Sequence, residues 1–226
     1  MNYALAMQGI STCDLSDACD ALGIVPAESG AIKAIYPGCP PLCGPIATCA
    51  MSPKGKIEIV IGTIELVDSA APGSLLLIDA SNHLDQNTIG SLVGVVAVQK
   101  RLAGAIIDGS VRDVQGLREL PFPVYARGTV VHSVRGRMGI DSINEPVTLG
   151  GKRVASGDVA AADENGAIVF PAARAKEIFQ LAWRTVALEH RLFEGIRHGG
   201  DPIPLHKAMK YDLSMKEQLA DKDLLK

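Results

Sequence analysis

The chain has 226 residues, of which 47% are hydrophobic, 21% charged and 4% aromatic, and a formal net charge of -3 gives it a pI near 5.9. This composition is that of a globular protein long enough to bury a sizeable core, and the lack of excess positive charge argues against general nucleic-acid binding. No apolar run approaches the roughly 18 residues that cross a bilayer, and the N-terminus lacks the pattern of a secretory signal, so we expect a cytoplasmic protein without membrane contact.

The first predicted helix covers residues 11–23. Ser11 and Asp14 match a capping box, apolar side chains recur at helical spacing, and Gly23 supplies a stop. Because no second Cys or His pair follows at metal-site spacing and no export signal is present, we expect the cysteines to be reduced thiols without a metal or catalytic role. The cysteines are Cys13, Cys19, Cys39, Cys43 and Cys49.

The next elements alternate between strands and helices. A strand is predicted near residues 44–50, within a stretch rich in Pro, Gly and Cys. Residues 56–70 begin like a strand but keep apolar side chains at helical spacing, so we favour a helix there. A buried strand follows at 74–79, and then a strongly polar loop at 80–87. Residues 92–101 are apolar almost all round, which predicts a helix buried on most of its surface.

A second buried strand, rich in β-branched residues, is predicted at 104–107 and is followed by Asp108-Gly109, a dipeptide typical of turns. Strand, loop, helix and strand together form a βαβ unit, whose right-handed crossover places two parallel strands side by side. This geometry brings the loop at 80–92 and the loop at 109–113 to the same edge of the sheet. Ligands of α/β proteins bind at such an edge.

Arg112 and Asp113 stand at this edge and offer complementary chemistry. A guanidinium holds a carboxylate or an enolate in its fork, whereas a carboxylate holds a hard divalent cation. Gly90, at the start of the apolar helix, lets backbone N–H groups approach an anion near the positive end of the helix dipole. A surface ion pair in a turn is the alternative explanation of an Arg-Asp dipeptide taken by itself.

Short strands separated by glycine-rich turns follow Arg112 and predict an antiparallel β layer. A long helix is predicted at residues 172–197, directly after Pro171. We therefore expect one α/β domain over residues 1–200 and a polar C-terminal tail over 201–226 that packs on the domain or on a neighbouring subunit. The predicted strands cover residues 123–126, 129–134, 145–149, 152–155, 159–163 and 167–170.

Four pieces of this sequence, in this order and spacing, carry a resemblance to a known family. The pieces are the helix SDACDALG, Pro72-Gly73, Gly104-x4-Gly109-x2-Arg112-Asp113-x2-Gly116, and Pro146-Val147-x2-Gly150-Gly151 with Gly157-Asp158, Asp163, Gly166 and Pro171 after it. Over residues 10–200 the chain resembles the RraA-like family, which includes class II pyruvate aldolases acting on 4-hydroxy-4-methyl-2-oxoglutarate and 4-carboxy-4-hydroxy-2-oxoadipate.

The resemblance implies an α/β fold, a β/β/α sandwich similar to the swivelling phosphohistidine domain, assembled as trimers or hexamers with active sites between subunits. It implies a divalent-metal-dependent lyase that cleaves or decarboxylates a small 2-oxo acid, such as 4-hydroxy-4-methyl-2-oxoglutarate or oxaloacetate, to pyruvate through its enolate. Asp113 would ligate Mg²⁺ or Mn²⁺ and Arg112 would stabilise the enolate. Backbone amides of Gly90, Ser91 and Leu92 would hold the substrate carboxylate.

Ser91 departs from the family, which has glycine or an acidic residue at this position, and the difference favours an unusual substrate. A hydroxyl does not replace a base, whereas a neutral imidazole accepts a proton near pH 7. We therefore add His83, in the polar loop, to Arg112 and Asp113 as a catalytic residue, and we keep His132 as a second candidate base.

The family also takes a glutamate from the adjacent subunit, for which Glu189 and Glu194 are the candidates. Two alternatives to an ordinary aldolase stay open. One is the same metal and enolate site with a divergent substrate, and the other is a non-catalytic regulator that binds ribonuclease E, as some family members do. The intact Arg112-Asp113 pair favours chemistry over binding alone.

Overall fold

The computed structural model describes residues 1–80, 83–210 and 217 of the chain. Among these residues, no helix combines the length and the apolar character needed to cross a membrane. Much of the expected tail over residues 201–226 lies outside the described residues.

Contacts between residues divide the chain into two compact units. One unit is Ala27–Ala172, and the other joins Met1–Pro26 to Ala173–Lys226. The expected single domain over residues 1–200 takes in all of the first unit and part of the second, and it stays a prediction.

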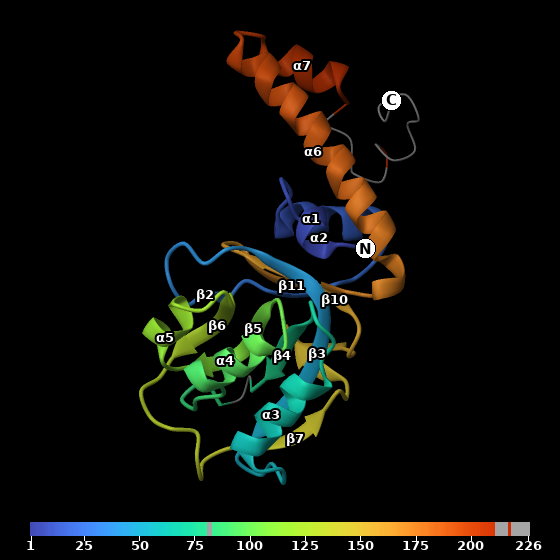
Figure 1. Ribbon diagram of the computed structural model, residues 1–226. Coiled ribbons are helices and arrows are strands. Elements are labelled where there is room, and N and C mark those ends of the chain that lie inside the picture. Colours follow the sequence, from blue (N-terminus) through green and yellow to red (C-terminus); the bar gives the residue numbers. More distant parts are fainter. Residues whose placement is uncertain (81–82, 211–216, 218–226) are drawn as a thin grey trace. The chain divides into compact units, whose positions relative to one another are not determined.

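A nine-stranded sheet forms the centre of the Ala27–Ala172 unit (Figure 1). Its strands run in the order β1-β11-β10-β3-β4-β5-β6-β2, with β7 paired to β3, while β8 and β9 form a separate hairpin. The strands are β1 (Ala27–Ser29), β2 (Lys33–Ala34), β3 (Leu42–Ser52), β4 (Leu75–Asp79), β5 (Gly104–Val111), β6 (Val124–Thr129), β7 (Gly139–Ile143), β8 (Val147–Leu149), β9 (Lys152–Val154), β10 (Val159–Asp163) and β11 (Gly166–Phe170).

The four strands β3 to β6 run parallel to one another, which confirms the predicted βαβ unit. The expected antiparallel layer is confirmed for the pairs β8–β9 and β10–β11. It is wrong for β6, which runs parallel to β5. The strand expected at 129–134 is also wrong, because β6 ends at Thr129 and the backbone then forms turns, as in the hydrogen bond from Arg137 N–H to the Val134 carbonyl at 3.0 Å.

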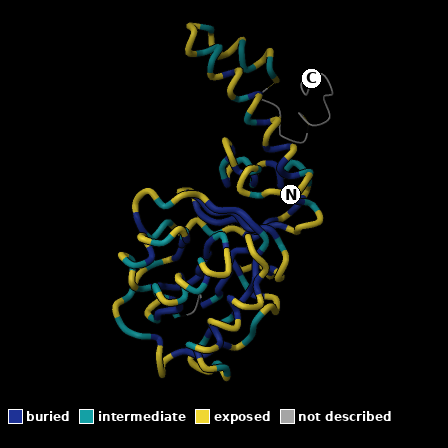
Figure 2. The backbone as a smooth tube through the Cα atoms, viewed as in Figure 1, coloured by how far each residue is buried: buried dark blue, intermediate teal, exposed yellow. Residues whose placement is uncertain are grey.

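Helices α3 (Ile59–Ser69), α4 (Ser91–Gln99) and α5 (Val114–Arg118) lie against one face of the sheet (Figure 1). Successive side chains of a strand point to opposite faces, so Leu76 packs with these helices whereas Leu77 belongs to the apolar cluster on the other face. Both faces of the central strands are therefore buried, as Figure 2 shows in dark blue. The helix favoured at residues 56–70 is confirmed as α3.

Helix α4 is exposed on its outer side, so the expectation that it is buried on most of its surface is wrong. Gly94 and Ala97 are its buried residues, whereas Leu92 and Val95 are 57% and 52% exposed. The reason is that the helix forms a single layer, with one side on the sheet and its neighbours and the other side facing outward. The outer apolar face, as we call the exposed apolar side chains of α3 and α4, consists of Ile61, Ile64, Leu92 and Val95.

The second unit is helical. Helix α2 (Thr12–Ala21) begins with the predicted capping box, in which the Ser11 hydroxyl accepts from the Asp14 N–H and the Asp14 carboxylate accepts from the Ser11 N–H. It packs on the long helix α6 (Ala175–Arg197), whose position confirms the helix predicted after Pro171. The other helical segments are α1 (Tyr3–Ala6), the 3-10 turn η1 (Ala172–Arg174) and α7 (Pro202–Ala208).

Candidate functional site

The two loops that were expected at one edge of the sheet lie together there. Asn87 forms a parallel bridge with Ser110 near the end of β5, and both the N–H and the hydroxyl of Thr88 donate to the Ser110 carbonyl at 2.9 Å. The Arg112 N–H donates to the Ile89 carbonyl at 3.2 Å. The loop before α4 is therefore fixed by main-chain hydrogen bonds to the chain that leaves β5.

Asp108 and Gly109 lie inside β5, so the predicted turn at this dipeptide is wrong. The strand continues because its backbone stays paired on the side of β4, where the Ala80 N–H donates to the Asp108 carbonyl at 2.9 Å, while the ladder to β6 skips Asp108 and Gly109. Gly109 serves close packing instead of a turn, since a Cβ there would lie 3.1 Å from the Ala80 Cβ and 3.3 Å from the Thr88 methyl carbon. The absence of a side chain at Gly109 thus lets the loop between β4 and α4 pack closely on β5.

Asp113 occupies the N-cap of α5 in a left-handed backbone conformation, with φ 59° and ψ 40°. Its Oδ2 accepts hydrogen bonds from the N–H and the hydroxyl of Ser91, both at 3.3 Å, and Arg112 Nε lies 3.8 Å from the same oxygen. A Cβ on Gly90 would come within 2.5 Å of Oδ2. The missing side chain at Gly90 therefore makes room for the carboxylate at the start of α4.

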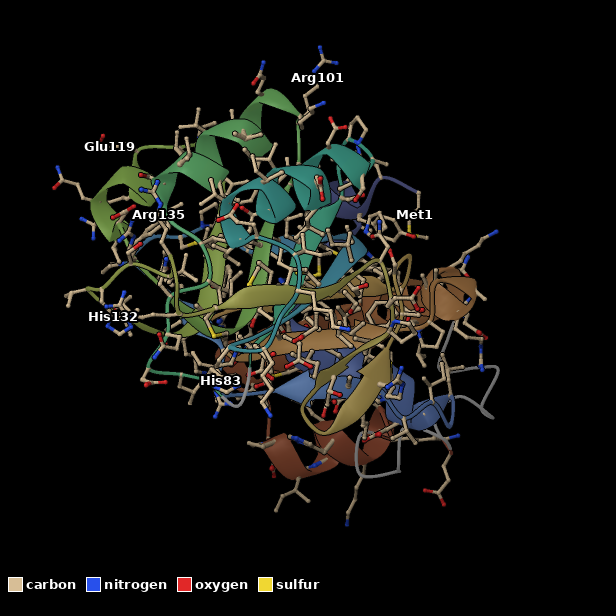
Figure 3. The ribbon with its side chains drawn as sticks, turned by 90° about the horizontal axis from the view of Figure 1, so that it is seen from below. Met1, His83, Arg101, Glu119, His132 and Arg135 are labelled. Carbon is tan, nitrogen blue, oxygen red and sulfur yellow. The ribbon has the colours of Figure 1, made fainter. Side chains whose placement is uncertain are left out.

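A pocket with a volume of about 100 Å³ opens beside this pair, between α3, α4 and the loop after β6. Asn87, Arg112, Asp113 and Arg135 are among its polar lining residues, and Figure 3 shows where Arg135 lies on the molecule. The pocket thus combines two cationic side chains with one carboxylate and an aliphatic wall. The aliphatic lining residues include Ile59, Val60, Ile64, Leu92, Val93 and Val134.

Two polar atoms of the pocket lining are buried without a hydrogen-bond partner in the described part of the chain. They are Arg112 Nε and Asn87 Oδ1. Buried polar atoms of folded proteins are almost always paired with protein, water or ligand. Arg112 Nε lies 3.8 Å from Asp113 Oδ2 but makes no hydrogen bond to it, so its N–H remains a donor that an acceptor oxygen of a ligand would satisfy.

The pocket offers few side chains that can bind a metal ion. Among the described residues, Asp113 is the one carboxylate that lines the pocket, and no three or more His, Cys, Asp or Glu side chains are grouped as for a metal. Zn²⁺ needs three or four protein ligands. Mg²⁺ is commonly held by one or two carboxylates, with water and substrate oxygens completing its shell. The residues present therefore fit Mg²⁺ or the similar Mn²⁺ and do not fit zinc.

The two histidine candidates are not among the residues that line the pocket. The His132 Nε2 lies 3.3 Å from Gln86 Oε1. Figure 3 shows His83 well apart from Arg135, with His132 between them in this view. A role of His83 in proton transfer stays a prediction, and two residues of its loop, 81 and 82, lie outside the described residues.

Glu189 and Glu194, the candidates for a glutamate lent to a neighbouring subunit, both stand on α6. Glu194 forms an ion pair with Arg197 at 2.8 Å. Their contribution to a site in another subunit stays a prediction.

Sequence reasoning did not single out Asn87 or Arg135, although both line the pocket. The sequence could have pointed to Asn87, because it is a polar residue at the end of the predicted loop, three residues before Gly90 at the start of α4. Arg135 carries no such signal, since it directly follows a segment that was predicted to be a strand and that forms a loop.

A second charged group, formed by Asp79 of β4, Asp108 of β5 and Arg127 of β6, lies outside the pocket lining. Arg127 Nη1 is 3.2 Å from Asp108 Oδ1, and the Asp108 side chain is only 7% exposed. Burial raises the pKa of the Asp108 carboxyl and the nearby Asp79 raises it further, whereas Arg127 acts in the opposite direction. Asp79 accepts a hydrogen bond from the Thr148 N–H at 3.0 Å.

The cysteines stand apart from this chemistry. All five are in the described residues and none forms a disulfide. Burial is the main cause that raises the pKa of the Cys43 and Cys49 thiols to about 12. Both thiols are therefore protonated and unreactive near neutral pH.

Comparisons with known proteins agree with one another. The family model described as RraA-like: Aldolase/RraA matches residues 12–169. A candidate 4-hydroxy-4-methyl-2-oxoglutarate aldolase of Halalkalibacterium halodurans is 27% identical over 182 residues, which cover 80% of this chain and 82% of that protein. Another, of Alcanivorax borkumensis, is 31% identical over 164 residues, or 72% and 96% of the two chains. The crystal structure of Streptomyces coelicolor RraAS2, an unusual member of the RNase ES inhibitor RraA protein family, has a TM-score of 0.70 at 25% identity and covers 86% of this chain and 94% of its own.

Proposed function

The chain belongs to the RraA-like family, and on this basis we propose that its pocket is the active site of a divalent-metal-dependent lyase acting on small 2-oxo acids. The reaction would be retro-aldol cleavage or decarboxylation that yields pyruvate or a related product. The observation that carries the proposal is the arrangement of Arg112 and Asp113 in the pocket lining beside the start of α4, with a buried Nε that has no hydrogen-bond partner 3.8 Å from a carboxylate oxygen.

Asp113 is the residue that would hold Mg²⁺ or Mn²⁺. When bound, such a cation supplies a Lewis acid that draws electron density from the 2-oxo group. Ser91 supports this role by donating two hydrogen bonds to Oδ2, which orient the carboxylate. In this respect Ser91 positions a ligand and does not act as a base.

Arg112 would bind the charge that develops during the reaction. As the C3–C4 bond of 4-hydroxy-4-methyl-2-oxoglutarate breaks, the C4 hydroxyl loses its proton to a base, for which His83 stays the candidate, and C4 becomes the carbonyl carbon of one pyruvate. The bonding electron pair stays on the C1–C3 fragment, so negative charge grows on its 2-oxo oxygen as the enolate of the second pyruvate forms. Decarboxylation of oxaloacetate, in which CO₂ leaves, produces the same charge. A buried donor such as Arg112 Nε, fixed before the substrate arrives, stabilises this oxygen more in the transition state than in the ground state.

The start of α4 would bind the substrate carboxylate. Gly90, Ser91 and Leu92 present backbone N–H groups at the positive end of the helix dipole, and the Ser91 N–H is shared with Asp113 Oδ2. The aliphatic wall next to this point keeps water away from the enolate carbon, so protonation there is controlled by the protein.

We also propose that the chain assembles as a homotrimer or homohexamer. The outer apolar face supports this proposal, because Ile64 and Leu92 belong both to that face and to the lining of the pocket. A second copy placed there would cover apolar surface and close the pocket at the same time. Size-exclusion chromatography with light scattering tests the assembly directly.

A non-catalytic regulator that binds ribonuclease E is the second candidate. The observation that favours it is the presence of one carboxylate only in the pocket lining, with a serine at the position where the family's aldolases are acidic. A third reading keeps the metal and enolate site for a divergent oxo acid.

The deciding experiment measures pyruvate release from oxaloacetate and from 4-hydroxy-4-methyl-2-oxoglutarate, with Mg²⁺ and with EDTA. Wild type is compared with Asp113→Asn and with the matched control Glu65→Gln, which neutralises an exposed carboxylate of α3 outside the pocket lining. We expect metal-dependent turnover that Asp113→Asn abolishes and Glu65→Gln retains. Metal binding without turnover would favour a divergent substrate, and no metal binding would favour the regulator.

A further inference from the structure

Asn87 is a buried polar residue whose side-chain oxygen forms no hydrogen bond that would stabilise the fold. The residue is 2% exposed, it lines the pocket, and its Oδ1 has no hydrogen-bond partner within the described chain. Its backbone is held firmly by the bridge to Ser110 and by the Thr88 hydrogen bond to the Ser110 carbonyl. The backbone therefore holds the side-chain amide at a fixed position, while its oxygen makes no hydrogen bond within the described chain.

The next residue shows what a structural polar side chain does at this place. Thr88 is equally buried, at 2% exposure, but its hydroxyl donates to the Ser110 carbonyl at 2.9 Å and so fixes the loop to β5. Asn87 makes no comparable bond. A buried acceptor without a hydrogen bond lowers the stability of the fold. Packing alone therefore does not explain why an amide stands at this position.

The two unpaired atoms of the pocket have opposite chemistry. Arg112 Nε is a donor and seeks an anionic oxygen, whereas Asn87 Oδ1 is an acceptor and seeks an O–H or N–H group. A ligand that satisfies both carries an O–H or N–H group as well as an oxygen anion, and among oxo acids the donor group is a hydroxyl. A dicarboxylic oxo acid without a hydroxyl satisfies Arg112 but leaves Asn87 unpaired.

We infer that Asn87 is a specificity-determining residue whose Oδ1 accepts a hydrogen bond from a hydroxyl group of the ligand. The inference rests on the proposed function, because that function is what makes the ligand a hydroxylated oxo acid. It adds a residue that recognises the hydroxyl group by a hydrogen bond. In a retro-aldol substrate this hydroxyl sits on the carbon whose bond breaks, so Asn87 would also orient the scissile bond.

The test uses two ligands that differ by one hydroxyl and that cannot react, 2-hydroxy-2-methylbutanedioate and 2-methylbutanedioate. Neither is a 2-oxo acid, so neither can be cleaved through an enolate. Titration calorimetry is performed in EDTA, because a bound cation would itself favour an α-hydroxy acid. We expect the wild-type protein to bind the hydroxylated ligand about tenfold more tightly, the gain of one neutral hydrogen bond.

Three variants separate the roles. Asn87→Ala should bring the affinity ratio close to one, and Asn87→Asp, which keeps an acceptor oxygen of the same shape, should retain the ratio even if its charge weakens both ligands. Thr88→Val, the matched control, should lower the melting temperature and leave the ratio unchanged. A ratio near one in the wild type, or a ratio that survives in Asn87→Ala, would overturn the inference.

Turnover with Mg²⁺ distinguishes the inference from the proposed function. In Asn87→Ala we expect kcat/KM to fall about tenfold for 4-hydroxy-4-methyl-2-oxoglutarate and to stay unchanged for oxaloacetate, whose keto form has no hydroxyl. Hydroxyl selectivity in EDTA without any wild-type turnover would remove the lyase proposal and leave the role of Asn87 intact. Equal losses for both substrates would remove the role of Asn87 and leave the lyase proposal intact.

Discussion

Replacing Gly90 by alanine should disable the site through one added methyl group. The new Cβ would lie 2.5 Å from Asp113 Oδ2 and 3.3 Å from its Cγ, whereas ordinary contact begins at 3.4 Å, so the carboxylate must move by about 0.9 Å. The Asp113 side chain is 43% exposed and has room to swing outward, and φ at Gly90 is -137°, which alanine adopts without strain. The cost therefore falls on the geometry of the site and not on the fold.

A displacement of about 1 Å at a reacting centre typically lowers the rate about 10²-fold. We expect Gly90→Ala to reduce kcat/KM for oxaloacetate by about this factor and to raise the Mg²⁺ concentration that half-maximal activity requires. The free energy of unfolding should change by less than about 1 kcal/mol. Pyruvate formation is followed with a coupled lactate dehydrogenase assay, and unfolding is followed in urea. Gly30→Ala is the control, because the nearest atom to its Cβ is 3.9 Å away. Wild-type kcat/KM in Gly90→Ala would refute the placement of the metal ligand at Asp113.

Three further predictions concern charges and thiols. Arg112→Lys removes the buried Nε and should lower kcat about 10²–10³-fold, and a loss confined to KM in steady-state kinetics would contradict a role in the transition state. Arg127→Leu should destabilise the fold by about 2 kcal/mol at pH 8, because it leaves the buried Asp108 carboxylate without its ion partner. The raised folded pKa of Asp108 means that its ionised form is disfavoured by folding, so stability is lost as pH rises through that pKa, and the variant should lose less at pH 4 than at pH 8 in urea unfolding. Equal losses at the two pH values would count against a charged Asp108. Cys43 and Cys49 should fail to react with Ellman's reagent at pH 8 until the protein is unfolded, because burial raises the pKa of both thiols to about 12, and rapid labelling of either in the native protein would show that it is not buried in solution.

Local sequence signals located most of the elements that position the site. The capping box at Ser11, the apolar spacing of α3 and the strand, loop, helix and strand pattern from β4 to β5 each follow from interactions within a few residues, and each is confirmed. The strand predicted at 129–134 is wrong because β-branched residues by themselves do not decide between a strand and a loop. Whether such a segment forms a strand depends on pairing partners that are distant in the sequence. The next strand after β6 is β7, which pairs with β3.

The site was predictable in its main chain and less so in its side chains. The shared sheet edge follows from βαβ geometry, so Gly90, Arg112 and Asp113 could be brought together without a structure. Asn87 could not, because a buried acceptor is recognised only when the pairing of every neighbour is known. Asp108 was misread as a turn residue because its burial comes from strands on both sides of it.

The left-handed backbone at Asp113 limits how the family can change at this position. Most residues pay about 1–2 kcal/mol in that conformation, whereas Gly, Asn and Asp adopt it at little cost. If the proposed function holds, a lineage that loses the reaction is expected to change to Asn or Gly here, which keeps the loop and the start of α5 while the proposed cation ligand disappears. A bulky β-branched residue at this position in a relative would instead signal that the whole turn has been rebuilt.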